Sequence, residues 1–346
     1  MDKSLRYLII LSLFAAIFAW LVIGLGAYTR LTDAGLGCPD WPGCYGHIGV
    51  PSTSESIQKA QALYPETPVV AAKAWAEMVH RYFAGTLGLL ILGIFFLAVK
   101  VSRASRQNFL FVAGVLLALL IYQAVLGMWT VTMQLLPVVV SQHLLGGMLL
   151  ISLLSYIHLR AKHHDMSKAQ SAALVKFKPW VLLGLSLVFL QIALGAWTST
   201  NYASLVCSDF PSCNGMLLPH FNFTEAFNLL SPLGVNYEGG VLTGTARITI
   251  QMVHRYGAFI VSAYTIGLVA AMLRKSDIKP ALKRVAWIVL AVLALQFTLG
   301  VLNIYLLLPL PIAVAHNMVA ALLIVSMVAL VFHTLYEKPS RQGARA

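Results

Sequence analysis

The sequence predicts an all-α integral membrane protein whose eight transmembrane helices form two tandem four-helix bundles, related by duplication and sharing one orientation. Three observations lead to this prediction. The 346 residues are 59% hydrophobic and 10% charged, whereas a soluble domain has about 25% charged residues. Eight apolar segments are long enough to cross a bilayer. Short motifs also recur at an offset of about 170 residues, which indicates an internal repeat.

Each apolar segment has the length of a membrane-spanning helix. A hydrocarbon core of about 30 Å requires about 20 helical residues, and helices are required because lipid offers no partner for backbone polar groups. We predict helices at 7–28, 77–100, 108–132, 138–160, 179–199, 249–273, 283–307 and 312–335. The first segment lacks a convincing cleavage site for a signal peptide, so it is expected to remain as a helix.

Matched motifs divide the chain into two halves. The pentapeptide Met-Val-His-Arg-Tyr occurs at 78–82 and again at 252–256. Further matches pair LGAYT at 25–29 with LGAWT at 194–198, QAVLG at 123–127 with QFTLG at 296–300, and the segment 38–44 with 207–213. We therefore expect an N-terminal half at 1–165 and a C-terminal half at 166–346. Because each half has four helices, both enter the membrane in the same direction.

The distribution of the net charge of +12 along the chain indicates the membrane topology. Most of the 24 Lys and Arg residues lie at the N-terminus, in the segments 100–106, 160–178 and 274–284, and in the C-terminal tail. These places fall on one side of an eight-helix protein, and most acidic residues fall on the other. The positive-inside rule then predicts that both termini are cytoplasmic. We expect membrane lipid, and no nucleic acid, as a partner of this chain.

The four cysteines lie in two long outer segments, at about 29–75 and 200–247. Their shared pattern, C-x-D-aromatic-P-x-C, favours the local disulfides Cys38–Cys44 and Cys207–Cys213, which an oxidising exterior permits. Zinc is the alternative, although the spacing differs from that of the usual zinc knuckles. The sequence has no C-x-x-C-H motif, which excludes covalent c-type haem.

Four histidines are the candidate metal ligands. His80, His143, His254 and His316 are each expected about four to six residues into a helix, roughly 6–9 Å below its outer end. Two imidazoles that face each other inside a helical bundle are typical axial ligands of haem iron. We therefore predict that His80 pairs with His143 and that His254 pairs with His316. A hydrogen bond to a neighbouring helix is the alternative for any one histidine.

Charged residues flank the first histidine of each pair. Arg81 and Arg255 directly follow His80 and His254. A guanidinium suits carboxylates such as haem propionates, although the side chain can equally extend to the lipid headgroups. Glu77 precedes His80 by three residues and shares its helix face, so it can act as a proton acceptor or donor. A carboxylate that merely stabilises the helix start is the alternative.

The matched position in the second half is Gln251, which cannot exchange a proton. Together, the two pentapeptides, the Glu-x-x-His pattern, the later histidines, the R-L-T-x-A-G-x-G-C segment at 30–38 and the duplication resemble the haem A synthase family over nearly the whole chain. The resemblance implies an enzyme, a haem-dependent oxidoreductase, that oxidises the C8 methyl group of haem O to the formyl group of haem A. This haem serves the terminal cytochrome oxidase.

The resemblance also assigns the sites. It implies that His80, His143 and Glu77 form the site for haem O, and that His254 and His316 hold a haem b cofactor that passes electrons. Cys38 and Cys44 match a pair that bacterial members carry, so the chain is expected in a bacterial inner membrane. The haem O synthase (protohaem farnesyltransferase) and an electron donor or acceptor are candidate partners. The sequence leaves the formation of a homo-oligomer open.

Two mechanisms and two other functions remain as alternatives. Either His80 or His143 dissociates to admit oxygen, or electrons are removed and water attacks with Glu77 as the base. A quinol-linked electron-transfer cytochrome with two b haems is the main alternative function, but all four histidines are expected at one depth rather than stacked across the membrane. A transporter built from parallel repeats is the other.

Overall fold

The computed structural model describes the chain apart from residues 1–2, 105–107, 165, 169–171, 276–277 and 338–346. Within that part, eight helices are long and apolar enough to cross a membrane. They are α1 (Lys3–Leu31), α3 (Ala71–Ala104), α4 (Leu110–Thr132), α5 (Pro137–Lys162), α6 (Ala172–Thr200), α8 (Gly244–Leu273), α9 (Pro280–Tyr305) and α10 (Leu310–Leu335). Each predicted segment corresponds to one of these helices, which confirms the predicted all-α membrane class.

Four short elements were not expected from the sequence. The helices α2 (Ser54–Leu63) and α7 (Phe223–Ala226) lie in the two long loops, and the strands β1 (Ser167–Lys168) and β2 (Tyr336–Glu337) pair antiparallel. α2 forms because the Thr53 side chain caps the backbone N–H of Ser56 in a capping box. In α7, the side chain of Asn222 accepts a hydrogen bond from the N–H of Glu225.

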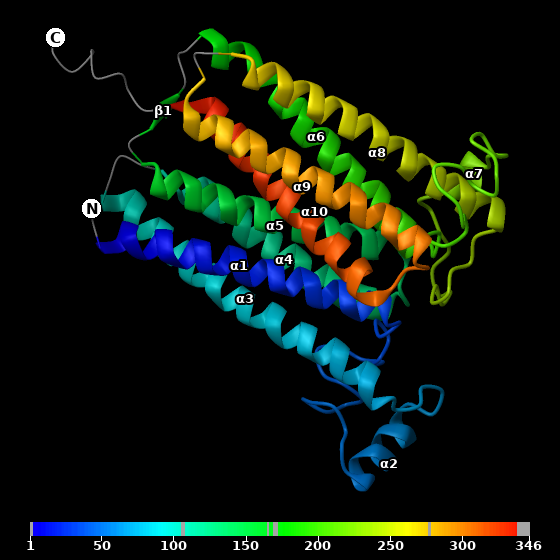
Figure 1. The fold of residues 1–346 in the computed structure, drawn as a ribbon. Helices are drawn as coiled ribbons and strands as arrows, with labels where there is room; N and C mark the ends of the chain where they lie inside the picture. The colour runs from blue at the N-terminus through cyan, green and yellow to red at the C-terminus, as the bar shows by residue number, and fades with distance from the viewer. Residues whose placement is uncertain (1–2, 105–107, 165, 169–171, 276–277, 338–346) are drawn as a thin grey trace.

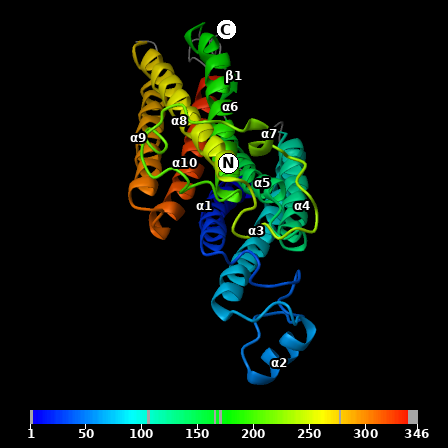
Figure 2. The ribbon, with the colours of Figure 1, turned by 90° about the vertical axis from the view of Figure 1, so that its right-hand side faces the viewer.

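The transmembrane helices form two groups that share a long interface. α1, α3, α4 and α5 pack together, and α6, α8, α9 and α10 form the second group. α10 is the most buried of the eight helices and contacts both α1 and α5, while α5 also contacts α6 (Figures 1 and 2). The small residues Ala320 and Ala321 of α10 lie within the core of the first group. The predicted duplication, and the division at 165/166, stay predictions; Asp165 lies outside the described residues, as do the basic residues Arg106, Lys338, Arg341 and Arg345.

The two ends of the bundle differ in character. α1 begins and α10 ends at one end, close to β1, while α2, α7 and the two long loops lie at the opposite end (Figure 1). Polar contacts at this end also join the first helix group to the second group and its loop. The Arg30 guanidinium donates to the Ser199 carbonyl at 2.6 Å, and Lys73 pairs with Glu238 at 3.3 Å. The candidate site therefore lies beneath a layer of loops that spans both groups.

The loops contain the two predicted disulfides, and both are formed. Cys38 is bonded to Cys44, and Cys207 is bonded to Cys213. All four cysteines are fully buried. The local pairing predicted from the C-x-D-aromatic-P-x-C pattern is thus correct.

The predicted position of the histidines within their helices is correct for only two of the four. α5 begins at Pro137 and α10 at Leu310, so His143 and His316 lie six residues beyond the helix start. α3 begins at Ala71 and α8 at Gly244, so His80 and His254 lie deeper than four to six residues. These helices begin earlier because their first turns are packed by the loops and, in α8, capped by Thr243.

Candidate functional site

The first Met-Val-His-Arg-Tyr copy anchors the first cysteine loop. Met78 packs in one buried cluster with Cys38 and Cys44. The Arg81 guanidinium donates to the carbonyls of the loop residues Asp40, Pro42 and Gly43, at 3.0, 3.3 and 2.5 Å. The Tyr82 hydroxyl donates to the Ile48 carbonyl at 3.2 Å. Three of the five pentapeptide side chains, Met78, Arg81 and Tyr82, therefore contact the first cysteine loop.

The second copy repeats these contacts. Met252 packs against Cys207 and Cys213. The Arg255 guanidinium donates to the carbonyls of Asp209 at 2.7 Å, Cys207 at 3.3 Å and Ser212, and the Tyr256 hydroxyl donates to the Leu217 carbonyl. Both arginines are thus engaged by loop carbonyls. Arg255 also lines the cavity described below, and its buried Nε has no hydrogen-bond partner among the described residues.

An aspartate closes the turn of each cysteine loop. The Asp40 carboxylate accepts hydrogen bonds from the N–H groups of Tyr45 and Gly46, at 2.6 and 2.8 Å. Asp209 accepts equivalent bonds from Asn214 and Gly215 at 2.5 and 2.9 Å, and one from the Ser212 hydroxyl. The hydroxyl contact, followed by the backbone N–H bonds, lowers the pKa of Asp209 to about 2. These carboxylates therefore act in loop structure.

The structure brings His80 of α3 and His143 of α5 together. Their ring centres are 6.5 Å apart and their planes are nearly perpendicular, at 88°. Two imidazoles that share one metal ion have ring centres about 6 Å apart, because each metal–nitrogen bond is about 2 Å and each nitrogen lies about 1 Å from its ring centre. The Nδ1 atoms of both rings are buried and have no hydrogen-bond partner in the described structure. The pair therefore fits a shared metal ion.

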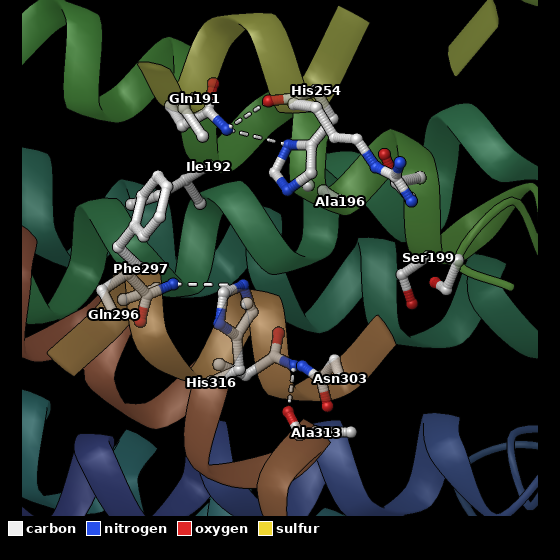
Figure 3. A pocket seen from close by; sticks show the side chains of 18 of the residues that line it. Gln191, Ile192, Ala196, Ser199, His254, Gln296, Phe297, Asn303, Ala313 and His316 are labelled. Carbon is white, nitrogen blue, oxygen red and sulfur yellow. Dashed lines mark hydrogen bonds between the residues drawn. The ribbon is translucent and has the colours of Figure 1, made fainter. Parts of the chain in front are cut away.

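The second histidine pair lines a cavity. Figure 3 shows His254 of α8 and His316 of α10 pointing toward each other across it. The cavity is also lined by Leu144 and Met148 of α5, so it lies where the two helix groups meet. Ser199 and Asn303 form a polar part of its wall, where the buried Oδ1 of Asn303 is without a partner in the described structure. A largely apolar cavity with a few polar groups is typical of a cofactor site.

A glycine from a neighbouring helix supports each histidine ring. A Cβ atom placed on Gly26, Gly195 or Gly300 would lie 3.0–3.1 Å from Cε1 of His80, His254 or His316, and one on Gly127 would lie 3.5 Å from Cε1 of His143. These glycines lie on α1, α6, α9 and α4. Because contacts of 3.0–3.1 Å are tighter than normal packing allows, the glycines let the Cε1 edge of these rings approach the neighbouring helix closely.

Glutamine side chains lie beside two of the rings, and a third glutamine lies over Gly146. The Gln191 Nε2 lies 3.0 Å from Nδ1 of His254 (Figure 3). The Gln296 Nε2 lies 3.3 Å from Nε2 of His316, so this amide would have to turn aside if that nitrogen bound a metal. Gln123 of α4 extends over Gly146, where a Cβ would collide with its amide. The small residues that follow the histidines therefore accommodate amide side chains in two places, Gly146 and Gly257.

Glu77 and Gln251 occupy matched positions, and each makes a hydrogen bond to its own loop. Glu77 is the acceptor of its bond, whereas Gln251 is the donor. Glu77 is buried; its Oε2 accepts the Cys38 N–H at 2.9 Å, and its Oε1 pairs with Arg81. In the second half the Gln251 Nε2 donates instead to the Ser204 carbonyl at 3.3 Å. The predicted carboxylate beside His80 is present, and it is held by the disulfide loop.

Comparison with known proteins identifies the family. The model of the COX15-CtaA family, described as cytochrome oxidase assembly protein, matches residues 9–328. The chain belongs to the COX15-CtaA family. A relative from Shewanella oneidensis, named haem A synthase, is 43% identical over 94% of this chain and 96% of its own length. Haem A synthases of Caulobacter sp. and Bacillus licheniformis are 27% and 28% identical, over 89% and 91% of this chain and 90% and 91% of their own lengths.

Several residues of this COX15-CtaA site escaped the sequence reasoning. The four supporting glycines lie inside the repeated segments LGAYT, LGAWT, QAVLG and QFTLG. In the sequence alone these segments indicate only the internal repeat. The role of Tyr82 and Tyr256 in holding the loops was also missed. The repeats do mark these residues, because each motif has a glycine or a tyrosine at the same place in both halves. The sequence does not show which helix or loop each of them contacts.

Proposed function

We propose that this protein is a haem A synthase that oxidises the C8 methyl group of haem O to the formyl group of haem A. The observation that carries the proposal is the relative named haem A synthase, which is 43% identical over nearly the full length of both chains. The COX15-CtaA match over residues 9–328 agrees with it. The protein is accordingly a haem-dependent oxidoreductase of a bacterial inner membrane, with eight membrane-spanning helices.

The two histidine pairs have different roles in this proposal. His80 and His143 hold the substrate haem O, and His254 and His316 hold a haem b cofactor. The ring separation of 6.5 Å supports the first assignment, and the cavity between His254 and His316 supports the second. The presence of Glu77 beside His80, and of Gln251 beside His254, favours chemistry in the first half and electron passage through the second.

Bound haem supplies the redox chemistry that methyl oxidation requires. The chain's own residues orient the substrate and handle its protons. Oxidation of a methyl group to a formyl group releases protons, and the Glu77 carboxylate is the acidic side chain on the helix face of His80. The Cys38 N–H and Arg81 fix its position. Glu77 is therefore the proposed proton acceptor, while Arg81 and the loop keep it oriented.

The propionate role predicted for Arg81 and Arg255 needs refinement. Arg81 makes three bonds to loop carbonyls and one ion pair with Glu77. Arg255 retains an unpartnered Nε at the cavity wall, near the polar residues Ser199 and Asn303. In this proposal Arg255 contributes to the carboxylate-binding end of the haem b site, and Arg81 acts mainly through the loop and Glu77.

The proposed setting follows from charge and chemistry. Both termini are placed in the cytoplasm by the positive-inside rule, which puts the cysteine loops and the outer ends of the histidine-bearing helices on the oxidising side. The haem O synthase that makes the substrate, and an electron partner, are the proteins expected to meet this chain. The two-haem electron-transfer alternative is not favoured, since the relatives are named for synthesis of haem A.

Chromatography of the extracted, non-covalent haems tests this function. The protein is purified after co-expression with a haem O synthase, and wild type is compared with Glu77→Gln. We expect haem B together with haem O and haem A in wild type. In the variant we expect haem A to fall by about 100-fold or more, as for loss of a general base, while haem B is retained. Haem B alone, at two per chain, would identify an electron carrier instead.

A further inference from the structure

One residue precedes each supporting glycine by a single helical turn and shares its helix face. These residues are Val22, Gln123, Gln191 and Gln296, four positions before Gly26, Gly127, Gly195 and Gly300. Positions i and i+4 share a helix face. Three of the four are glutamine, and the exception is Val22, beside His80. The site of the proposed substrate therefore lacks one amide that the other ring positions have.

Gln191 makes two contacts to His254. Its Nε2 lies 3.0 Å from Nδ1 of the ring and donates to the His254 carbonyl at 2.9 Å (Figure 3). Gly257 makes room for this amide, because a Cβ at that position would collide with the Gln191 Oε1. The same Oε1 is buried and has no hydrogen-bond partner among the described residues. A ligated ring carries its proton on Nδ1, and this oxygen could accept it after the amide turns.

The matched positions around His80 are filled differently. Val22 stands where Gln191 stands, and Phe83 follows the first pentapeptide where Gly257 follows the second. Phe83 stacks on Phe18, with ring centres 5.4 Å apart. The His80 Nδ1 makes no hydrogen bond to any described residue. The Val22 carbonyl lies near the ring, but its geometry does not meet that of a hydrogen bond to Nδ1, which has no partner among the described residues.

We propose that Gln191 is a positioning residue that keeps His254 on the iron of the resident haem, and that the Val22–Phe83 pair leaves His80, whose Nδ1 has no partner in the described structure (nor has that of His143), as a replaceable ligand of the substrate haem. This inference rests on the proposed function. A partner on the outer ring nitrogen fixes the orientation of a metal-bound imidazole and raises its basicity. A ring without such a partner leaves the metal more readily, which would open a coordination position beside Glu77.

The test measures the rate at which carbon monoxide binds the ferrous haem of the purified protein. Gln191→Val removes the amide beside His254. Gly257→Ala displaces this amide, because the new Cβ would collide with the Gln191 Oε1. Both should raise the rate of binding at haem B by roughly ten- to a hundredfold, the usual effect of losing an outer partner. Gly267→Ala is the matched control on α8, because nothing lies within 4 Å of a Cβ there; it should leave the rate unchanged.

The reverse exchange tests His80. Val22→Gln combined with Phe83→Gly supplies the amide and the space for it, and should slow carbon monoxide binding at bound haem O by a similar factor. Phe83→Gly alone should not slow it. Equal rates in wild type, Gln191→Val and Gly257→Ala, with haem content preserved, would overturn this inference and leave the proposed function intact. Wild-type protein that binds no haem would overturn the proposed function itself.

Discussion

Glu77 accepts a hydrogen bond from the Cys38 amide, whereas Gln251, at the matched position, donates one to the Ser204 carbonyl. The surroundings of these two residues are otherwise alike. In both halves the arginine and tyrosine of the pentapeptide hold a disulfide loop, and an aspartate closes the loop turn. The two halves therefore differ in polarity at the position three residues before the first histidine of each pair. The pentapeptide and its disulfide loop are thus arranged alike in both halves, while the residue three positions before that histidine differs.

The same comparison extends to Val22 and Gln191, and to Phe83 and Gly257. In each pair the second-half residue supports a hydrogen bond to the ring of His254, and the first-half residue does not. The first half instead has a buried carboxylate. This pattern is expected if one half holds a fixed cofactor and the other a substrate that must react and leave. Three predictions test this difference between the halves.

The largest effect is expected from removing a histidine. His254→Ala should lose the haem b cofactor and lower haem A formation by more than about 100-fold, because a missing ligand should exceed the ten- to hundredfold effect of an outer partner. His80→Ala should lower haem A formation equally but retain haem b. Pyridine haemochrome spectra of each purified variant, normalised to protein, measure the content. Equal loss of haem b in both variants would contradict the division of roles.

A smaller difference is expected between the two disulfides. Each closes a loop of the same sequence separation, 6 residues, so replacing either pair by serine should lower the free energy of unfolding by about 2 kcal/mol. Haem A formation should fall by roughly ten- to a hundredfold only when Cys38 and Cys44 are replaced, because the Cys38 amide positions Glu77. Thermal unfolding and product chromatography measure the two effects. A similar loss of activity from both replacements would mean that the loops act only through stability.

The sequence predicted the framework well because membrane helices follow strong rules. Length and hydropathy located all eight helices, since lipid tolerates no unpaired backbone. The disulfides followed from cysteine spacing. The helix starts of α3 and α8 were wrong because their outer turns are stabilised by loops, whose packing has no hydropathy signal.

The candidate site was predicted less completely. The repeated motifs identified His80, His143, His254 and His316, but not the glycines behind them. Which helix faces which is set by packing between segments far apart in sequence, such as Gly26 against His80. Arg81 was expected to bind propionates, yet its donors are directed to the first cysteine loop. The sequence shows which polar side chains are present, but their hydrogen-bond partners depend on the three-dimensional structure.

The smallest expected effect concerns the second loop alone. Ser212 occupies the place of Gly43, so Asp209 accepts a hydrogen bond from a hydroxyl at a loop position where the first loop has glycine. The pKa of Asp209 is lowered to about 2 from an ordinary value of 3.8. A depressed pKa means that the ionised carboxylate stabilises the folded loop above about pH 4, and that this contribution is lost as the pH falls toward 2.

Hydrogen exchange of the peptide containing Asn214 and Gly215, corrected for the intrinsic pH dependence, should therefore increase between pH 4 and 2. Asp209→Asn should remove this pH dependence. Ser212→Gly, which places in the second loop the glycine that the first loop has at Gly43, should shift the increase to higher pH by returning the Asp209 pKa toward its ordinary value. The first loop of the same sample is the internal reference. If Ser212→Gly left the second loop's profile unchanged, the backbone N–H groups alone would account for the low pKa of Asp209.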